Sequence, residues 1–231
     1  MSKRDTVARY VERTARLLAP LRAQLPIAHY FHSRSGLGEP ELELLANLVE
    51  ATKEAVDVGA NIGLYTYRLS KLCSHVFAFE PNPVLFRVLE GARLANVSPR
   101  CVALSGRTGT ADFFVPQAAY GELLGWGSLV PGRCPEARAE RTLTVQTATL
   151  DSFGLTRVSF VKMDVEGHEL AVLSGSEATI AANRPVLLLE VDEPHRQGVD
   201  SLLRRHRYRR RELEELFGVR GSPVNLLYLP D

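Results

Sequence analysis

Cysteine, methionine and tryptophan are scarce in this 231-residue chain, which has three, two and one of them. The cysteines, Cys73, Cys101 and Cys134, are far apart and form no C-x-x-C pair, which is typical of free thiols in a reducing compartment. No apolar run approaches the roughly 20 residues needed to cross a bilayer. The start of the chain lacks the unbroken apolar segment of a signal peptide. We therefore expect a soluble, cytoplasmic protein.

An excess of charge of one sign is also missing, because 28 basic and 27 acidic residues leave a formal net charge of +1. This balance gives no electrostatic argument for binding nucleic acid or an anionic membrane. Acids directly follow the arginine-rich stretch 204–211, so we interpret it as self-compensated surface. With 45% hydrophobic residues, the chain is expected to form one domain over 51–231, preceded by an N-terminal helical extension over 1–50.

The N-terminal extension is expected to hold two helices. Apolar residues recur with helical spacing over about Thr6–Leu25, with arginines between them, and Pro26 is expected to break the pattern. This helix would pack against its own domain or against a second copy of the chain, with membrane contact as the weaker alternative. The second helix is expected over about 39–49, because a proline and acidic residues suit a helix N-terminus.

Short apolar segments alternate with helical segments through the rest of the chain. Repeated βαβ units predict an α/β fold with a parallel sheet and right-handed crossovers, and the last two strands are expected to pair antiparallel. The expected strands are Glu54–Val58, Val76–Glu80, Arg100–Leu104, Val158–Met163, Val186–Val191, Tyr208–Arg211 and Asn225–Leu229. The expected helices are Gly63–Leu72, Pro83–Ala95, Glu166–Ser174, Glu177–Asn183 and about Ser201–His206.

One stretch departs from this alternation. The β-rich segments Ala111–Val115 and Leu143–Thr147 flank a glycine- and proline-rich loop over about 116–141. A loop of this length is usually a lid, a binding loop or disordered. It contains several apolar residues and the single tryptophan, Trp126. We interpret it as a lid that faces the substrate.

The strand that ends near Asp57 leads into a glycine turn, Gly59–Gly63, and the next strand ends in Glu80. Such a unit is how an open α/β sheet holds an adenosine-containing cofactor. A dinucleotide fingerprint needs a glycine where Asn61 stands and a third glycine that is absent here. A carboxylate beside the turn would repel a pyrophosphate but suits the cationic groups of S-adenosylmethionine, and Glu80 can accept from both ribose hydroxyls.

Six sequence blocks occur in order: VDVGANIGLYT, FAFEPNP, ALSGRTG, TLDSF, VKMDVEGHELAVLSG and RPVLLLEV. On these blocks, over roughly Glu54–Val191, the sequence resembles the FkbM family of S-adenosylmethionine-dependent methyltransferases. The resemblance implies a seven-stranded Rossmann-like class I methyltransferase sheet, with strand order 3-2-1-4-5-7-6 and helices on both faces. It also implies O-methylation of a hydroxyl on a sugar or small-molecule acceptor, such as a natural product or polysaccharide. The cofactor residues that it implies are Asp57, Gly59, Asn61, Gly63 and Glu80, with Asn82 and Ser105 around the ribose and adenine.

Methyl transfer needs an aligned acceptor and a group that removes its proton. Asp57 and Asp164 should end neighbouring parallel strands, which places Asp164 near the cofactor and the transferred methyl. We expect the base among Asp164, His168 and Glu190, although most family members carry a small residue where His168 stands. Lys162 lies inside an apolar strand, where its ammonium needs a buried partner such as Asp57 or Glu190.

Two carboxylates on the next helix have a plainer interpretation. Glu166 and Glu169 would lie in its first turn, where acids can cap the helix and compensate its dipole, and we favour that role for Glu169. Glu166, with Asp57, Glu80 and Asp164, instead argues against a decayed site.

Three further alternatives remain open from the sequence. Asp164, Asp192 and Glu193 follow adjacent strands and could hold Mg²⁺, but acids at strand ends are common and we do not favour a metal. The chain could instead be an N-methyltransferase or a noncatalytic S-adenosylmethionine-binding protein. A nicotinamide-dependent oxidoreductase is disfavoured by Asn61 and the missing third glycine. The acceptor itself is not specified, because the 116–141 loop and the N-terminal helices lie outside the resemblance.

Overall fold

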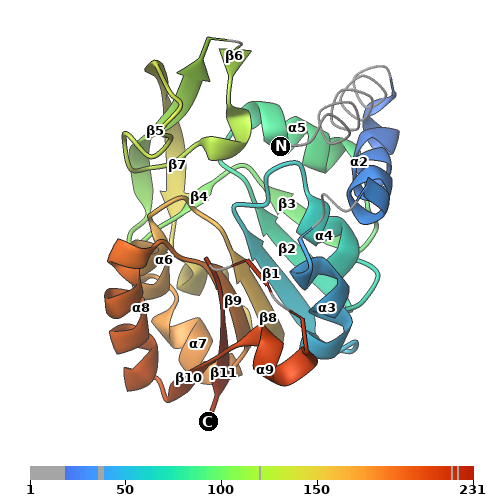
Figure 1. The fold of residues 1–231 in the computed structure, drawn as a ribbon, viewed down its shortest axis with the longest axis vertical. Coiled ribbons are helices and arrows are strands. Elements are labelled where there is room, and N and C mark those ends of the chain that lie inside the picture. The colour runs from blue at the N-terminus through green and yellow to red at the C-terminus, as the bar shows by residue number, and fades with distance from the viewer. Residues whose placement is uncertain (1–18, 36–38, 120, 220, 223) are drawn as a thin grey trace.

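The computed structural model describes residues 19–35, 39–119, 121–219, 221–222 and 224–231. Most of the helix expected over Thr6–Leu25 therefore lies outside the described residues. The described part forms two sheets and the helices around them (Figure 1).

The larger sheet has seven strands and confirms the α/β class. Its order is β10-β11-β9-β8-β1-β2-β3, which reads 3-2-1-4-5-7-6 from the other edge when the strands are numbered within this sheet. β11 pairs antiparallel with both β9 and β10, as expected for the last two strands, and the other pairs are parallel. The strands are β1 (Glu54–Val58), β2 (His75–Phe79), β3 (Val97–Arg100), β8 (Val158–Met163), β9 (Val186–Glu190), β10 (Tyr208–Arg211) and β11 (Asn225–Pro230).

Helices cover both faces of this sheet because successive side chains of its strands point in opposite directions. Val56 and Val58 pack into one buried cluster, whereas Ala55 between them belongs to the cluster on the other face. The first cluster includes residues of α6 (Glu169–Ser174), α7 (Glu177–Asn183) and α8 (Glu193–Arg205). The second includes residues of α3 (Glu41–Leu48), α4 (Leu64–Leu69) and α9 (Leu213–Phe217). α5 (Pro83–Gly91) lies on this second side, beside α4 (Figure 1).

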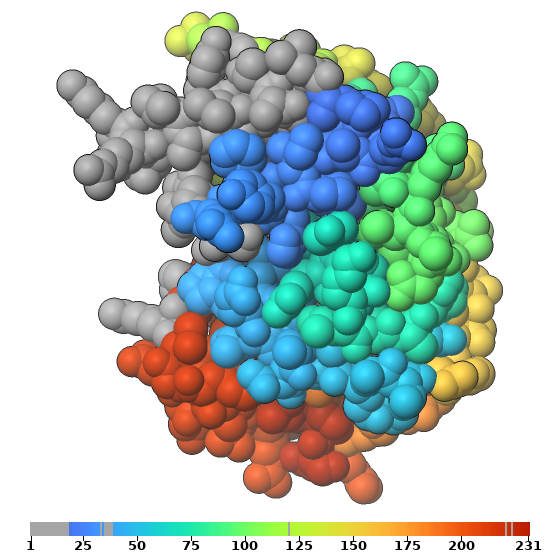
Figure 2. All heavy atoms as spheres, turned by 90° about the vertical axis from the view of Figure 1, so that its right-hand side faces the viewer, coloured from blue at the N-terminus to red at the C-terminus, as the bar shows by residue number. Residues whose placement is uncertain are grey.

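The expectation that Pro26 breaks the first helix is wrong, because α2 runs over Leu21–Ser35 with this proline inside it. Packing explains the difference. Leu25 and Ala28 are fully buried, and α2 lies against α4 and α5 (Figure 2). Burial of these side chains offsets the one helical hydrogen bond that a proline removes.

A second sheet of four strands, in the order β4-β7-β5-β6, contains the two expected β-rich segments and extends them into the ends of the expected loop. β5 and β7 form a long antiparallel hairpin, paired from Gly109 with Thr147 to Gln117 with Ala139. The loop expected over 116–141 therefore begins and ends inside strands, and what remains between them includes a short 3-10 helix, η1 (Leu124–Trp126). The strands are β4 (Ala103–Leu104), β5 (Gly109–Ala118), β6 (Gly121–Glu122) and β7 (Ala139–Ala148).

Several element bounds also differ from the expectation. The single strand expected over Arg100–Leu104 is two: β3 ends at Arg100 in the large sheet, and β4 pairs with β7 in the small one. α6 starts at Glu169 because Glu166 and Gly167 have left-handed backbones, with φ of 51° and 95°, which no α-helix accommodates. α8 starts eight residues earlier than expected, at Glu193, with a proline in its first turn.

The three cysteines are free thiols, as expected. Within the described ranges, no helix is both long enough and apolar enough to span a bilayer.

Candidate functional site

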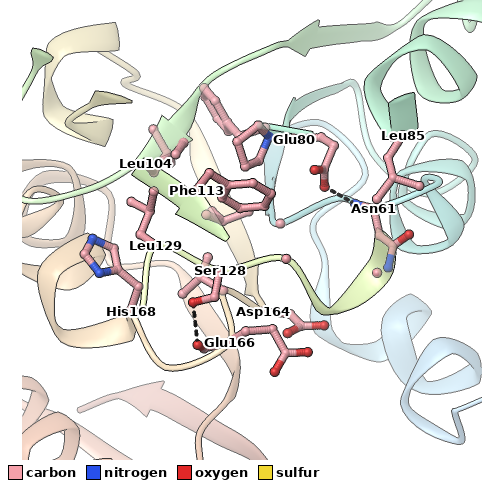
Figure 3. Close-up of a pocket in the computed structure, with 18 of the residues that line it drawn as sticks. Asn61, Glu80, Leu85, Leu104, Phe113, Ser128, Leu129, Asp164, Glu166 and His168 are labelled. Carbon is pink, nitrogen blue, oxygen red and sulfur yellow. Dashed lines mark hydrogen bonds between the residues drawn. The ribbon is translucent and has the colours of Figure 1, made fainter. Parts of the chain in front are cut away.

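Two adjoining cavities open at the carboxyl edge of the large sheet. The first lies between the ends of β1, β2 and β8 and the hairpin of the small sheet (Figure 3). Among the described residues that line it there is no lysine or arginine. Its polar lining residues are Asn61, Glu80, Ser128, Asp164, Glu166 and His168, and its apolar walls include Leu85, Val102, Leu104, Phe113 and Leu129.

The glycine turn after β1 forms the floor shared by both cavities. Gly59 has a φ of 75°, and a Cβ on it would lie 1.7 Å from the backbone oxygen of Asp164. Only glycine therefore allows the turn to approach the end of β8 so closely. Asn61 also has a positive φ, 54°, which asparagine tolerates better than most residues. Its backbone N–H donates to Glu80 Oε2 at 2.7 Å, which fixes the turn to the end of β2.

Glu80 is a buried carboxylate held from two sides by backbone N–H groups. Oε2 accepts from Asn61 and Oε1 accepts from Asn82, each at 2.7 Å. Only 4% of the residue is exposed, and desolvation by burial raises the pKa of its carboxyl to about 7. The hydrogen bonds from Asn82 and Asn61 oppose that rise, and the acceptor sites left on both oxygens can take ligand hydroxyls.

Asp57 lies under the turn and faces the second cavity rather than the first. Its Oδ2 accepts from the Thr66 hydroxyl at 2.5 Å, and the residue is 1% exposed. Burial raises the pKa of its carboxyl to about 6, although the Thr66 hydrogen bond and the Lys162 charge lower it. Asp57 is therefore a buried charge centre behind the glycine turn.

A group of carboxylates lies where β8 and β9 end. Asp164 lines both cavities, and Figure 3 shows the Glu166 side chain extending to the same side of the first one. Burial, followed by the negative charges of Asp164 and Glu190, raises the pKa of Glu166 to about 8. Burial, followed by the charge of Asp164, raises the pKa of Glu190 to about 7. These carboxyls hold protons more tightly than exposed ones and are correspondingly stronger bases.

Lys162 is the cation within this group. Its Nζ lies 4.0 Å from Glu190 Oε2 and 5.1 Å from the centre of the Tyr65 ring. The residue is 2% exposed. The prediction that Lys162 pairs with Asp57 or Glu190 is confirmed, and Glu190, whose side chain is 33% exposed, is the partner.

The segment between β5 and β7 covers the site. Ser128 Oγ donates to the Glu166 carbonyl at 2.8 Å, and Arg133 forms an ion pair with Asp192 just past β9. The backbone at Gly125 approaches Asn61 so closely that a Cβ there would lie 2.8 Å from its Nδ2. The apolar residues of the expected lid thus lie on the cavity, with Leu124 and Leu129 in its lining.

The family model "Methyltransferase FkbM domain" matches residues 57–210, which is more than half of the chain. This chain belongs to the FkbM methyltransferase family. The matched region begins at Asp57. It includes the residues of the large sheet that line the two cavities, the β5–β7 hairpin and Glu190.

Curated relatives of this FkbM protein include two methyltransferases named for sugar or oxygen acceptors. The hexuronic acid methyltransferase AglP of Haloferax volcanii is 36% identical over 141 residues, which cover 55% of this chain and 52% of that protein. The 2-O-methyltransferase NoeI of Sinorhizobium fredii is 29% identical over 149 residues, covering 56% of this chain and 59% of that protein. The chain thus matches little more than half the length of either relative.

A solved structure supports the fold. The SMU.1697c protein of Streptococcus mutans, crystallised in complex with S-adenosylhomocysteine (SAH), superposes with a TM-score of 0.50 at 11% identity. The match covers 82% of this chain and 94% of that one. It shows that the FkbM protein shares the methyltransferase fold.

The structure divides the predicted site residues into two groups. Gly59, Asn61, Glu80 and Asp164 line the first cavity, and Asp57 lines the second. The other predicted cofactor residues line neither, and support the site from behind. These are Gly63, Asn82 and Ser105.

The first two of these supporting residues serve the helices. A Cβ on Gly63 would lie 2.7 Å from the Leu89 side chain, so this glycine allows close packing of helices. Asn82 is fully buried and caps α5, its side chain accepting from Val84 N at 3.0 Å.

His168 lies apart from the other two predicted catalytic residues. Its Nε2 is 2.9 Å from Ser105 Oγ, and Figure 3 shows its ring beside Leu129, away from the Asp164 carboxylate. Burial lowers the pKa of its imidazole, which favours the neutral form. The structure therefore brings Glu190 together with Asp164, whereas His168 lies at the far end of the cavity.

Glu166 was not among the residues predicted for catalysis or cofactor binding. It was expected in the first turn of a helix, but its left-handed backbone places it before α6 and its side chain lines the cavity. The available signal was Gly167, the glycine that follows Glu166, because glycine commonly marks a turn and so indicates that the helix starts later. Phe113 and Leu129 gave no comparable signal, since their place depends on the hairpin pairing.

The chemistry of the first cavity fits S-adenosylmethionine. Apolar walls suit an adenine, Glu80 suits ribose hydroxyls, and the acids at the β8 end suit a sulfonium. No lysine or arginine is present among its described lining residues to meet a pyrophosphate, and burial favours the neutral form of His168.

Two of the three carboxylates of the magnesium alternative, which we did not favour, have basic partners. Asp192 is paired with Arg133, and Glu193, whose side chain is 80% exposed, is 2.6 Å from Arg196. Within the described residues, no three His, Cys, Asp or Glu side chains form a group that could hold a metal ion.

Proposed function

We propose that this FkbM protein is an S-adenosylmethionine-dependent O-methyltransferase acting on a hydroxyl of a sugar or a related small molecule. The observation that carries the proposal is the cavity at the carboxyl edge of the sheet, with Glu80 at one side and Asp164 and Glu166 at the other. Glu190 lines neither cavity but lies close enough for its charge to act on Glu166. The strand order of the large sheet supports it as well, since ligands of such sheets bind at this edge. The names of the relatives AglP and NoeI support a sugar or oxygen acceptor.

Each part of the cavity has a distinct task in this proposal. Glu80 accepts hydrogen bonds from the ribose hydroxyls, and Leu85, Leu104 and Phe113 pack on the adenine. The acids near Asp164 stabilise positive charge close to the sulfur. His168, held by Ser105, bounds the adenosine end. The hairpin segment with Ser128 excludes water from the site.

The cofactor supplies a methyl group already activated by its attachment to a sulfonium. The chain must then orient the acceptor and take up the hydroxyl proton as the oxygen attacks. Asp164, Glu166 and Glu190 are the carboxylates at this position, and a base with a pKa of about 8 is well matched to neutral pH. We assign the uptake of the proton to Glu166, whose pKa is raised by burial and then by the charges of Asp164 and Glu190.

Binding and transfer are tested separately. Titration calorimetry should show S-adenosylmethionine and SAH binding, and no binding of NAD. Glu80→Ala should weaken SAH binding by about 100-fold, because a charged hydrogen-bond acceptor for the ribose is lost. Unchanged SAH binding by this variant would overturn the cofactor assignment.

Transfer is measured with a labelled methyl group on a panel of sugars and hydroxylated natural products. Glu166→Gln should lower kcat by about 100-fold at neutral pH and leave SAH binding unchanged. The matched control is Glu193→Gln, whose side chain is exposed and paired with Arg196. Label on nitrogen would identify an N-methyltransferase, and binding without transfer to any acceptor would favour a noncatalytic protein.

A further inference from the structure

The second cavity adjoins the first across the glycine turn. The two share Gly59, Asn61 and Asp164, so a ligand in the first can continue into the second. It is lined by residues far apart in the sequence, and three of them, His32, Glu39 and Leu42, come before the region that the family model matches. The rest of its lining includes Asp57, Tyr65, Trp126, Lys162 and Asp164.

This cavity carries charges of both signs. Lys162 supplies a buried ammonium, and Glu39, Asp57 and Asp164 supply carboxylates. The first cavity, by contrast, has no lysine or arginine among its described lining residues. A wall of this mixed kind matches a zwitterion, such as the amino-acid end of a ligand, better than a neutral or purely anionic group.

Glu39 is held in place at the mouth of this cavity. Its Oε2 accepts from the Tyr65 hydroxyl at 2.5 Å and from Asn225 Nδ2 at 3.5 Å. The residue stands just before α3, so the N-terminal segment, α4 and β11 meet at its carboxylate. Burial is the main cause of the raised pKa of Asp164 and of Glu190, and the charge of Glu39 adds to the rise in both.

We propose that Glu39 binds the ammonium of the methionyl end of S-adenosylmethionine, which lies in the second cavity with its carboxylate toward Lys162. The proposal rests on the proposed function and extends it, because Glu39 lies outside the matched region 57–210. The residues just before α3, which include Glu39, thereby become part of the cofactor site. They lie at the end of the site opposite His168.

The test compares two ligands with the same adenosine, binding to the full chain in titration calorimetry. SAH carries the amino-acid end, and 5′-methylthioadenosine lacks it. Glu39→Gln keeps the size and the acceptor for Tyr65 but removes the charge. We expect it to weaken SAH binding about tenfold or more, the effect of losing a charge-assisted hydrogen bond. Binding of 5′-methylthioadenosine should be unchanged, which also shows that the variant is folded.

Glu43→Gln is the matched control, because Glu43 lies on α3 with a 68% exposed side chain and faces Arg68 at 3.8 Å. It should change neither affinity. Equal weakening of both ligands by Glu39→Gln would overturn the proposal. Intact SAH binding would overturn it as well, and a raised KM for the acceptor would then assign the cavity to the acceptor. If the unaltered protein binds neither ligand, the proposed function itself fails, and the two failures are thus distinguishable.

Discussion

Glu80 should make the ligand-free protein less stable as the pH rises through neutrality. Its carboxyl is 4% exposed, and burial raises its pKa from the ordinary value of 4.5 to about 7. The folded protein therefore binds this proton more tightly than the unfolded chain does. The resulting stabilisation is present in full below about pH 4.5 and is lost as the pH rises through 7. The loss amounts to about 3 kcal/mol when complete.

The substitution Glu80→Gln removes this titration while keeping the shape of the side chain. One of the backbone N–H groups of Asn61 and Asn82 then faces an amide NH₂ instead of a carboxylate oxygen. That costs about 1–3 kcal/mol at every pH. The difference in unfolding free energy between variant and parent should therefore shift in favour of the variant by about 2 to 3 kcal/mol between pH 5 and pH 8.

Urea denaturation of the ligand-free protein at several pH values measures this difference. The other buried carboxyls, such as Asp57 and Glu166, contribute to both proteins and cancel in the difference. Glu43→Gln is the control, because its side chain is 68% exposed and its substitution should give a difference that does not change with pH. A flat difference curve for Glu80→Gln, or one that falls with pH, would refute the argument that Glu80 is held in the fold against its desolvation.

Two further substitutions test the backbone around the site. Gly59→Ala should abolish SAH binding in calorimetry and destabilise the protein by about 3 kcal/mol or more, since its Cβ would overlap the Asp164 oxygen. Gly132→Ala, with a similar φ of 72° and open space around it, should cost only about 1–2 kcal/mol; equal effects would contradict the steric argument. Asn82→Ala removes the cap of α5 and should lower the unfolding free energy by about 1 kcal/mol in urea melts; an unchanged midpoint would show that the cap is dispensable.

The sequence was sufficient to predict the sheet and its acidic edge, because both depend on local patterns. Val186–Glu190 was identifiable as a central strand from its continuous apolar run. Asp57, Glu80 and Asp164 were identifiable as edge residues because each follows or ends such a strand next to a turn. The side chains that meet at the carboxyl edge of a parallel sheet can therefore be inferred without coordinates.

The walls of the cavity could not be predicted in this way. Phe113 and Leu129 come from the hairpin segment, and their place is decided by the pairing of β5 with β7, whose strands lie far apart in the sequence. Glu166 required knowledge of a left-handed backbone, and the continuation of α2 through Pro26 required knowledge of what Leu25 packs against. Each of these depends on tertiary contacts that override local preference.

The electrostatics of the site connect its cost in stability to its function. Burial raises the pKa of Asp57, Glu80, Asp164, Glu166 and Glu190, so this edge of the fold holds ionised carboxylates only at a cost. Among the described residues that line the two cavities, Lys162 is the one lysine or arginine, and it lies beside Glu190. A cationic ligand between these carboxylates would reduce their mutual repulsion, whereas an anionic one would increase it. The buried carboxylates that destabilise the ligand-free fold above neutral pH thus favour a sulfonium cofactor over a phosphate-bearing one. This preference follows from their charge and their burial.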